Sequence, residues 1–253
     1  MTTKVLLISL SSTQHNQTFF DCYEPLALAV LKGHLLSSFG KKLEVFNVDM
    51  QHDEYCSLKN LIKLINNIKP NIIGLSVPWG TLNILDNLIK KIFKDGVLNC
   101  RPVVILGKQL PSNFPEKIIE RYVEYPILIN IGPGEIALED LVTNPKKLKN
   151  IRNIVYEQKD KIRYNSISND YIVKYPAWHE NLDRYNIIAM QTSRGCSWSR
   201  CSFCLRLKNN KRSSCQWTPI SPTVVIKEII KLSSILIKNL FLVFQLELTK
   251  YYY

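Results

Sequence analysis

The chain has 253 residues, a hydrophobic content of 46% and a formal net charge of +12 at pH 7. This length can hold one large domain or two smaller ones, and no stretch reaches the roughly 20 apolar residues of a membrane span. The lysines are scattered over expected helices and loops, which argues against nucleic-acid binding as the main function. Residues 1–10 are typical of a strand and not of a signal peptide, so we expect a cytoplasmic protein without membrane attachment.

Residues 1–142 alternate between strand-like and helix-like segments. The expected strands are residues 5–10, 43–48, 72–77, 103–106 and 127–131, and the expected helices are residues 24–39, 57–68, 83–93, 116–122 and 135–142. This alternation predicts an α/β fold with a Rossmann-like, doubly wound parallel sheet. Ligands of such sheets bind beyond the carboxyl ends of the strands.

Two further segments follow this domain. Residues 143–186 are more polar and are expected to form a linker that carries a small hairpin at residues 154–156 and 162–164. A second α/β unit is expected from residue 187, with strands at 187–190 and 237–244. The helix between them is expected at residues 222–236, because Ser221 is a favourable N-cap and Pro222 suits the first helical position.

Three cysteines lie within nine residues after the strand at 187–190: Cys196, Cys201 and Cys204. In a reducing compartment such a group suggests a metal before a disulfide. Three thiolates can hold three irons of a 4Fe–4S cluster and leave the fourth iron open for a substrate or cofactor. The alternative is a structural zinc site that adds Cys215 as the fourth ligand. Only the Cys201/Cys204 pair has the spacing of a zinc knuckle, so the cluster is favoured.

With both halves in view, the chain resembles the cobalamin-binding-domain radical S-adenosylmethionine (AdoMet, or SAM) proteins. In the second half the resemblance rests on TSRGC at 192–196, CSFC at 201–204, the helix start at Ser221 and Glu228. In the first half it rests on EPL at 24–26, KPNIIGLS at 69–76, ILG at 105–107 and GPGE at 132–135. The cysteine motif is specific, whereas the glycine and proline motifs are individually weak.

The resemblance implies radical chemistry at the cysteines. Cys196, Cys201 and Cys204 would ligate the cluster, AdoMet would bind the open iron, and its reductive cleavage would release a 5′-deoxyadenosyl radical. A reductant such as flavodoxin or ferredoxin would supply the electron. Phe203 would lie near the adenine, and Arg194 is either a positive charge beside the cluster or an ordinary solvated arginine.

The resemblance also implies a cobalamin site in the first domain and methyl transfer to an unactivated carbon. The residues expected to contact this cofactor are Ser76, Gly107, Gly134 and Glu135. The Asp-x-His-x-x-Gly run that often supplies a cobalt ligand is missing from the sequence. Cobalamin would then bind without a protein histidine, or it would not bind at all.

Two departures affect the second half. Four residues separate Cys196 from Cys201, where the family usually has three. Residues 187–253 cover about one and a half of the six βα units of a radical AdoMet barrel, so the sequence resembles a truncated member whose barrel a partner chain could complete. Two other interpretations stay open: a non-catalytic remnant, and a module that binds cobalamin or another ligand without catalysis.

Overall fold

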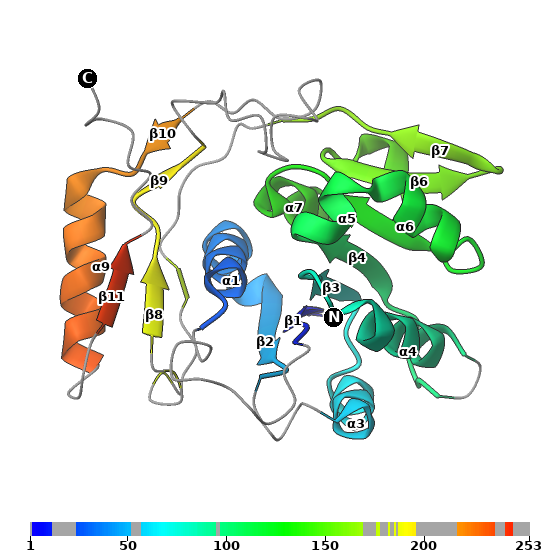
Figure 1. Cartoon of the computed structure of the whole chain (residues 1–253), viewed down its shortest axis with the longest axis horizontal. Helices are drawn as coiled ribbons and strands as arrows, with labels where there is room; N and C mark the ends of the chain where they lie inside the picture. The colour runs from blue at the N-terminus through cyan, green and yellow to red at the C-terminus, as the bar shows by residue number, and fades with distance from the viewer. Residues whose placement is uncertain are drawn as a thin grey trace.

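The computed structural model describes residues 2–11, 24–51, 57–94, 97–168, 176–177, 182, 185, 187–195, 217–235 and 241–244. Its main body is a seven-stranded sheet with the strand order β2-β1-β3-β4-β5-β6-β7 (Figure 1). The strands are β1 (Thr3–Ser9), β2 (Leu43–Asp49), β3 (Ile72–Ser76), β4 (Val103–Gly107), β5 (Ile127–Asn130), β6 (Ile154–Gln158) and β7 (Lys161–Tyr164). None of the helices in the described residues combines the length and apolar character that a bilayer span requires.

The first five strands of the sheet run parallel, and β1 pairs with both β2 and β3. The central strands are almost continuously apolar and buried, as expected for a parallel sheet that is covered on both faces. The predicted Rossmann-like α/β fold is therefore confirmed, and each strand predicted between residues 1 and 142 is present with shifts of one or two residues at its ends.

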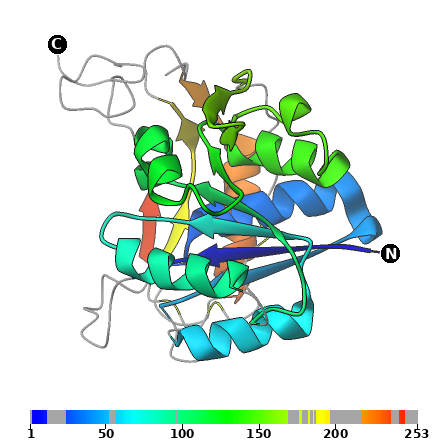
Figure 2. The same cartoon turned by 90° about the vertical axis from the view of Figure 1, so that its right-hand side faces the viewer.

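Helices cover both faces of this sheet. One face packs against α3 (Leu58–Ile68), α4 (Leu82–Phe93), α5 (Gln109–Asn113) and α6 (Pro115–Arg121). The other face packs against α1 (Leu26–Phe39) and α7 (Gly134–Thr143). Figure 2 shows the strands between these layers, with α4 in front of them and α1 behind.

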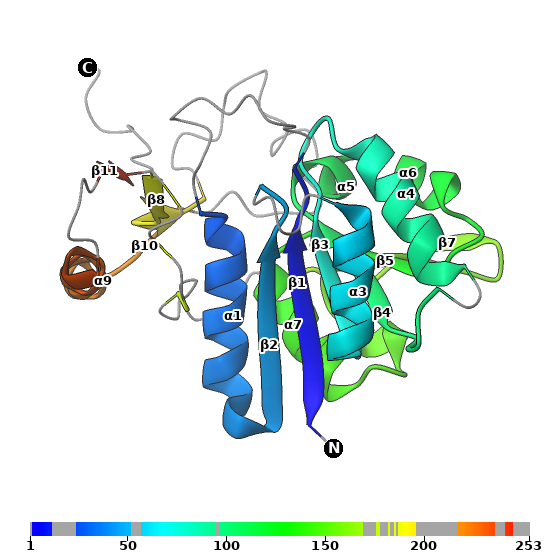
Figure 3. The same ribbon diagram turned by 90° about the horizontal axis from the view of Figure 1, so that it is seen from below.

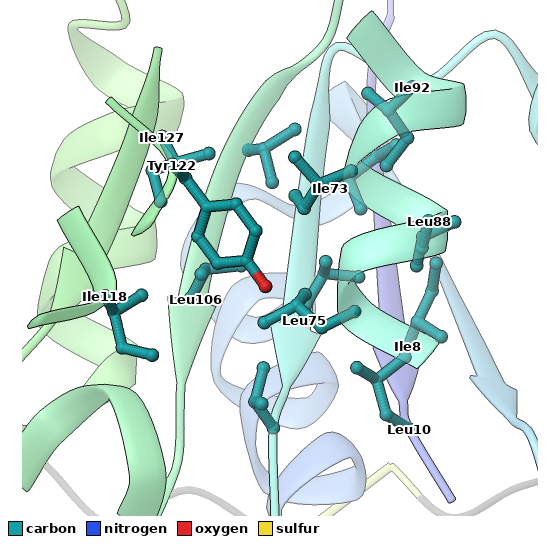
Figure 4. Close-up of a cluster of buried hydrophobic side chains, with 14 of the residues drawn as sticks. Ile8, Leu10, Ile73, Leu75, Leu88, Ile92, Leu106, Ile118, Tyr122 and Ile127 are labelled. Carbon is teal, nitrogen blue, oxygen red and sulfur yellow. The ribbon is translucent and has the colours of Figure 1, made fainter. Parts of the chain in front are cut away.

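The larger core cluster lies under α4 and α6 (Figure 4), where the ring of Tyr122 packs among Leu106, Ile118 and Ile127. Its hydroxyl donates a hydrogen bond of 2.7 Å to Asp86 Oδ1, and Asp86 also pairs with Arg121 at 2.5 Å. The hydrogen bond from Arg121 holds the pKa of the Asp86 carboxyl below its usual value, although burial acts in the opposite direction. The buried phenol therefore has a charged acceptor, which removes the cost of an unpaired polar group.

Two elements differ from the sequence-based expectation. The hairpin expected in the linker forms β6 and β7, and β6 extends the main sheet because it pairs antiparallel with β5. Helix α5 was not predicted, because it has only five residues and contains Pro111. The hairpin covers the edge of β5 that would otherwise stay open to other strands.

A second unit packs against α1. Strand β8 (Ile187–Met190) pairs in parallel with β11 (Phe241–Phe244), and α9 (Pro222–Ile235) comes between them in the sequence. A short two-stranded piece joins β9 (Ser193–Arg194) to β10 (Thr218–Pro219). Figure 3 shows α1 between β2 and β8, and Ala29 of α1 is buried with Ile188 and Met190. This position explains why α1 is apolar on two sides.

Candidate functional site

A cavity of about 470 Å³ lies at the carboxyl ends of β3, β4 and β5, where α1 and α7 cover the sheet. Four residues that the sequence predicts as cofactor contacts line this one space: Ser76, Gly107, Gly134 and Glu135. Its apolar wall includes Leu7, Leu31, Ile105 and Leu138. The location agrees with the general rule that ligands of parallel α/β sheets bind at this edge.

Several glycines line this cavity. A Cβ atom at Gly107 would meet nothing closer than Asn130 at 3.9 Å, so a side chain there would extend into the cavity without striking the protein. At Gly134 the nearest atom would be Leu31 Cδ2 at 3.2 Å, and at Gly74 it would be Leu7 Cδ2 at 2.8 Å. The absence of a side chain at Gly107 therefore keeps the cavity open there, whereas Gly74 and Gly134 allow Leu7 and Leu31 to pack closely against the backbone.

Asn153 fixes the turn that carries the cavity wall. Its Nδ2 donates to the carbonyl oxygens of Pro133 and Ser168 at 3.1 and 2.9 Å, and its own carbonyl accepts a hydrogen bond from Asn130 Nδ2 at 3.1 Å. A Cβ at Gly132 would lie 2.9 Å from Asn153 Cγ. Gly132 is therefore required for the packing of the turn.

Glu135 and Arg194 form an ion pair at the cavity. Glu135 is only 4% exposed, and its Oε1 lies 2.5 Å from Arg194 Nη2. Arg194 Nε also donates to Gln191 Oε1 at 2.9 Å, and both residues line the cavity. The arginine side chain is 22% exposed, so it is not the ordinary solvated arginine that the sequence left open. The pair connects α7 to the segment that precedes Cys196.

Lys108 is a cavity residue that the sequence did not indicate. It follows β4 with φ 77° and ψ −171°, a backbone region that is essentially restricted to glycine. Its side chain lies at the exposed mouth of the cavity. Desolvation lowers the pKa of its ammonium, although the Asp49 carboxylate raises it in part. No sequence signal marks this residue, because its backbone conformation is not a preference of lysine.

The expected cluster ligands Cys196, Cys201 and Cys204 lie outside the described residues, as do Phe203 and Cys215. The residues that precede the cysteines are described, and they follow β8 as predicted. Cys100 is half-buried, and desolvation raises the pKa of its thiol.

Comparisons with known proteins found similar proteins both by sequence and by structure. A curated relative, 4′-phospho-dehydrooxetanocin synthase of Priestia megaterium, is 30% identical over 221 residues, which cover 81% of this chain. The cobalamin-dependent AdoMet radical enzyme OxsB, solved with aqua-cobalamin and AdoMet bound, matches 96% of the chain with a TM-score of 0.79 and 23% identity. The chain is thus similar in sequence to this synthase and similar in fold to a cobalamin-dependent AdoMet radical enzyme.

A second solved structure extends this relationship. The radical AdoMet methyltransferase TsrM from Kitasatospora setae, solved with cobalamin and a 4Fe–4S cluster, matches 97% of the chain with a TM-score of 0.71 and 18% identity. No family model matches the chain. The chain spans 28% of the length of the curated relative, 34% of OxsB and 48% of TsrM. The resemblance predicted from the sequence is thus confirmed.

Glu228, one of the residues on which the sequence resemblance rests, is a carboxyl on α9 that is only 6% exposed. Its Oε1 has no hydrogen-bond partner among the described residues. Burial raises its pKa to about 7, and the charge of Lys231 acts in the opposite direction. The folded protein therefore holds a proton on this carboxyl at a pH where the unfolded chain has lost it.

This difference predicts a pH-dependent stability. Because the folded-state pKa lies above the unfolded value, stability falls as the pH rises from about 4.5 to about 7. We expect Glu228→Gln to remove this dependence and to raise the free energy of unfolding at neutral pH by up to about 3 kcal/mol. Urea unfolding of both proteins between pH 4.5 and 7.5 measures the effect. If the free energies of unfolding of the two proteins changed in parallel with pH over this range, the raised pKa of Glu228 would be contradicted.

Proposed function

We propose that this chain binds cobalamin at the cavity between α1, α7 and the sheet, and acts in radical AdoMet chemistry. The observation that supports it most strongly is the glycine-lined cavity, which brings Ser76, Gly107, Gly134 and Glu135 together at the carboxyl edge of the sheet. The curated relative and the solved neighbours add weight, since OxsB and TsrM are described with cobalamin bound.

The residues of the cavity fit the tail of a corrinoid. Its volume of about 470 Å³ lies within the range of about 300–1,000 Å³ that small-molecule sites occupy. Leu7, Leu31 and Leu138 offer an apolar wall for the flat base of such a tail. Polar groups at Ser76 and Asn130 could orient it. The backbone at Gly107 is open to close approach.

We further propose that Cys196, Cys201 and Cys204 hold a 4Fe–4S cluster with AdoMet on its open iron. With these cofactors bound, the site would gain radical chemistry and methyl transfer to an unactivated carbon. The protein's part is then to position the segment before the cysteines, and the Arg194–Glu135 pair is suited to this because it joins that segment to the cavity wall. The proposed partners are a small reductant such as flavodoxin or ferredoxin and a chain that completes the barrel.

Anaerobic reconstitution with iron and sulfide tests this function. We expect about four irons per chain, the number in a 4Fe–4S cluster, and a reduced electron paramagnetic resonance signal that changes when AdoMet is added. The Cys204→Ala variant should lose the cluster, whereas Cys100→Ala should keep it.

The same experiment separates the alternatives. Cys215→Ala should leave the cluster intact, but it would disrupt a zinc site of four cysteines. A colourless zinc protein would overturn the radical function. Cobalamin binding without any cluster would instead assign a binding module.

A further inference from the structure

Lys108 occupies a conformation that lysine does not favour, and it does so at the cavity. The values φ 77° and ψ −171° place Cβ where only glycine is normally tolerated. Such strain persists only when the surrounding structure enforces it, and it is concentrated at ligand sites. The neighbouring Gly107 has no such φ, so the strained backbone belongs to the residue that carries the charge.

In the part of the chain that the structure describes, the charge of Lys108 is not neutralised by an ion pair. Among the described residues, no carboxylate lies within ion-pair distance of its ammonium. The Glu135 carboxylate on the cavity wall is already paired with Arg194. The Asp49 carboxylate affects the Lys108 ammonium only by a coulombic interaction. This carboxylate accepts hydrogen bonds from the Gln51 backbone N–H and from the hydroxyl of Tyr185. Within the described residues, the cavity therefore carries a positive charge without an ion-pair partner, which favours an anionic ligand group.

We infer that Lys108 is a specificity residue whose ammonium binds the phosphodiester in the nucleotide tail of a corrinoid. This inference rests on the proposed cobalamin site. It adds that the Lys108 ammonium would select a corrinoid with a complete tail. A phosphodiester is the negatively charged group of such a tail, and a lysine at the cavity mouth provides a mobile point charge for it. The strained backbone directs this side chain from the end of β4, beside the glycine that opens the cavity.

A pair of ligands tests this role. Hydroxocobalamin carries the complete tail, whereas dicyanocobinamide lacks the phosphodiester and the base. Binding of both to the full chain is measured by equilibrium dialysis, with the corrinoid quantified by absorption. We expect Lys108→Met to weaken hydroxocobalamin binding about tenfold, the scale of one charge-assisted hydrogen bond, and to leave dicyanocobinamide binding unchanged.

Three further variants separate binding from folding. Lys108→Arg should retain most of the affinity for hydroxocobalamin. Lys108→Gly should lose the same affinity as Lys108→Met but raise Tm by about 3 °C, because glycine relieves the backbone strain. Lys117→Met removes an exposed lysine from α6 on the opposite face of the sheet and should change neither affinity.

Four outcomes would overturn the inference. An equal loss of affinity for both corrinoids in Lys108→Met would show a general effect on the cavity, and an unchanged affinity for hydroxocobalamin would show that the charge is not used. If the unmodified chain binds dicyanocobinamide as tightly as hydroxocobalamin, the proposed cobalamin site is retained, but the role of Lys108 is contradicted. If it binds neither corrinoid, the proposed function fails together with this inference.

Discussion

Replacing Gly107 with leucine should weaken cobalamin binding about 10- to 100-fold while the protein stays folded. A Cβ at this position has no protein atom within 3.9 Å, so the new side chain would enter the cavity and occupy the space of the ligand. The expected loss is comparable to the cost of overpacking a filled site, about 1–3 kcal/mol. Equilibrium dialysis with hydroxocobalamin measures the affinity, and thermal unfolding of the ligand-free protein measures the stability.

Two other substitutions serve as controls for this prediction. Gly107→Ala should give a smaller loss of affinity, because it adds a single carbon to the same space. Gly132→Ala should instead destabilise the ligand-free protein, since its Cβ would lie 2.9 Å from Asn153 Cγ and displace the amide that holds the turn. Tight cobalamin binding by Gly107→Leu would contradict the assignment of the cavity.

Replacing Arg194 with methionine should lower the free energy of unfolding by about 3 kcal/mol. The substitution leaves the Glu135 carboxylate buried without its cation, and removing one partner of a buried pair is strongly destabilising. Glu135→Gln should cost less, about 1 kcal/mol, because Arg194 is partly exposed and can reach solvent. Urea unfolding followed by circular dichroism measures both variants.

The double variant completes a thermodynamic cycle. We expect Arg194→Met combined with Glu135→Gln to cost less than the sum of the single changes, since the carboxylate without a partner is then absent. Arg163→Met removes an exposed arginine on β7 and should stay within about 0.5 kcal/mol of the unmodified protein. If the losses of unfolding free energy in the two single variants simply added up in the double variant, the ion pair would not connect α7 to the segment before the cysteines.

Local patterns predict much of the fold and part of the site. The alternation of apolar strands and helices fixes the parallel sheet, and Gly40 ends α1 with φ 55° as a helix-terminating glycine should. Ser76, Gly107 and Gly134 were predicted from the family resemblance, and they line one cavity because parallel strands bring their carboxyl ends to one edge. These predictions depend on short segments, so one sequence is enough to make them.

Other features depend on contacts between distant segments. Glu135 and Arg194 are 59 positions apart, and no local pattern indicates that they meet. The antiparallel pairing of β6 with β5 likewise depends on where the chain returns to the sheet after α7. The conformation of Lys108 contradicts the preference of its own residue type, so only the structure could reveal it.

The most direct test is a crystal structure of the full chain with hydroxocobalamin, in which anomalous scattering locates the cobalt. We expect the cobalt at the carboxyl edge of the sheet, with the corrinoid tail between α1 and α7 and against Gly107 and Gly134. A corrinoid bound elsewhere on the molecule, or a cavity that stays free of it at saturating concentration, would contradict the cobalamin site.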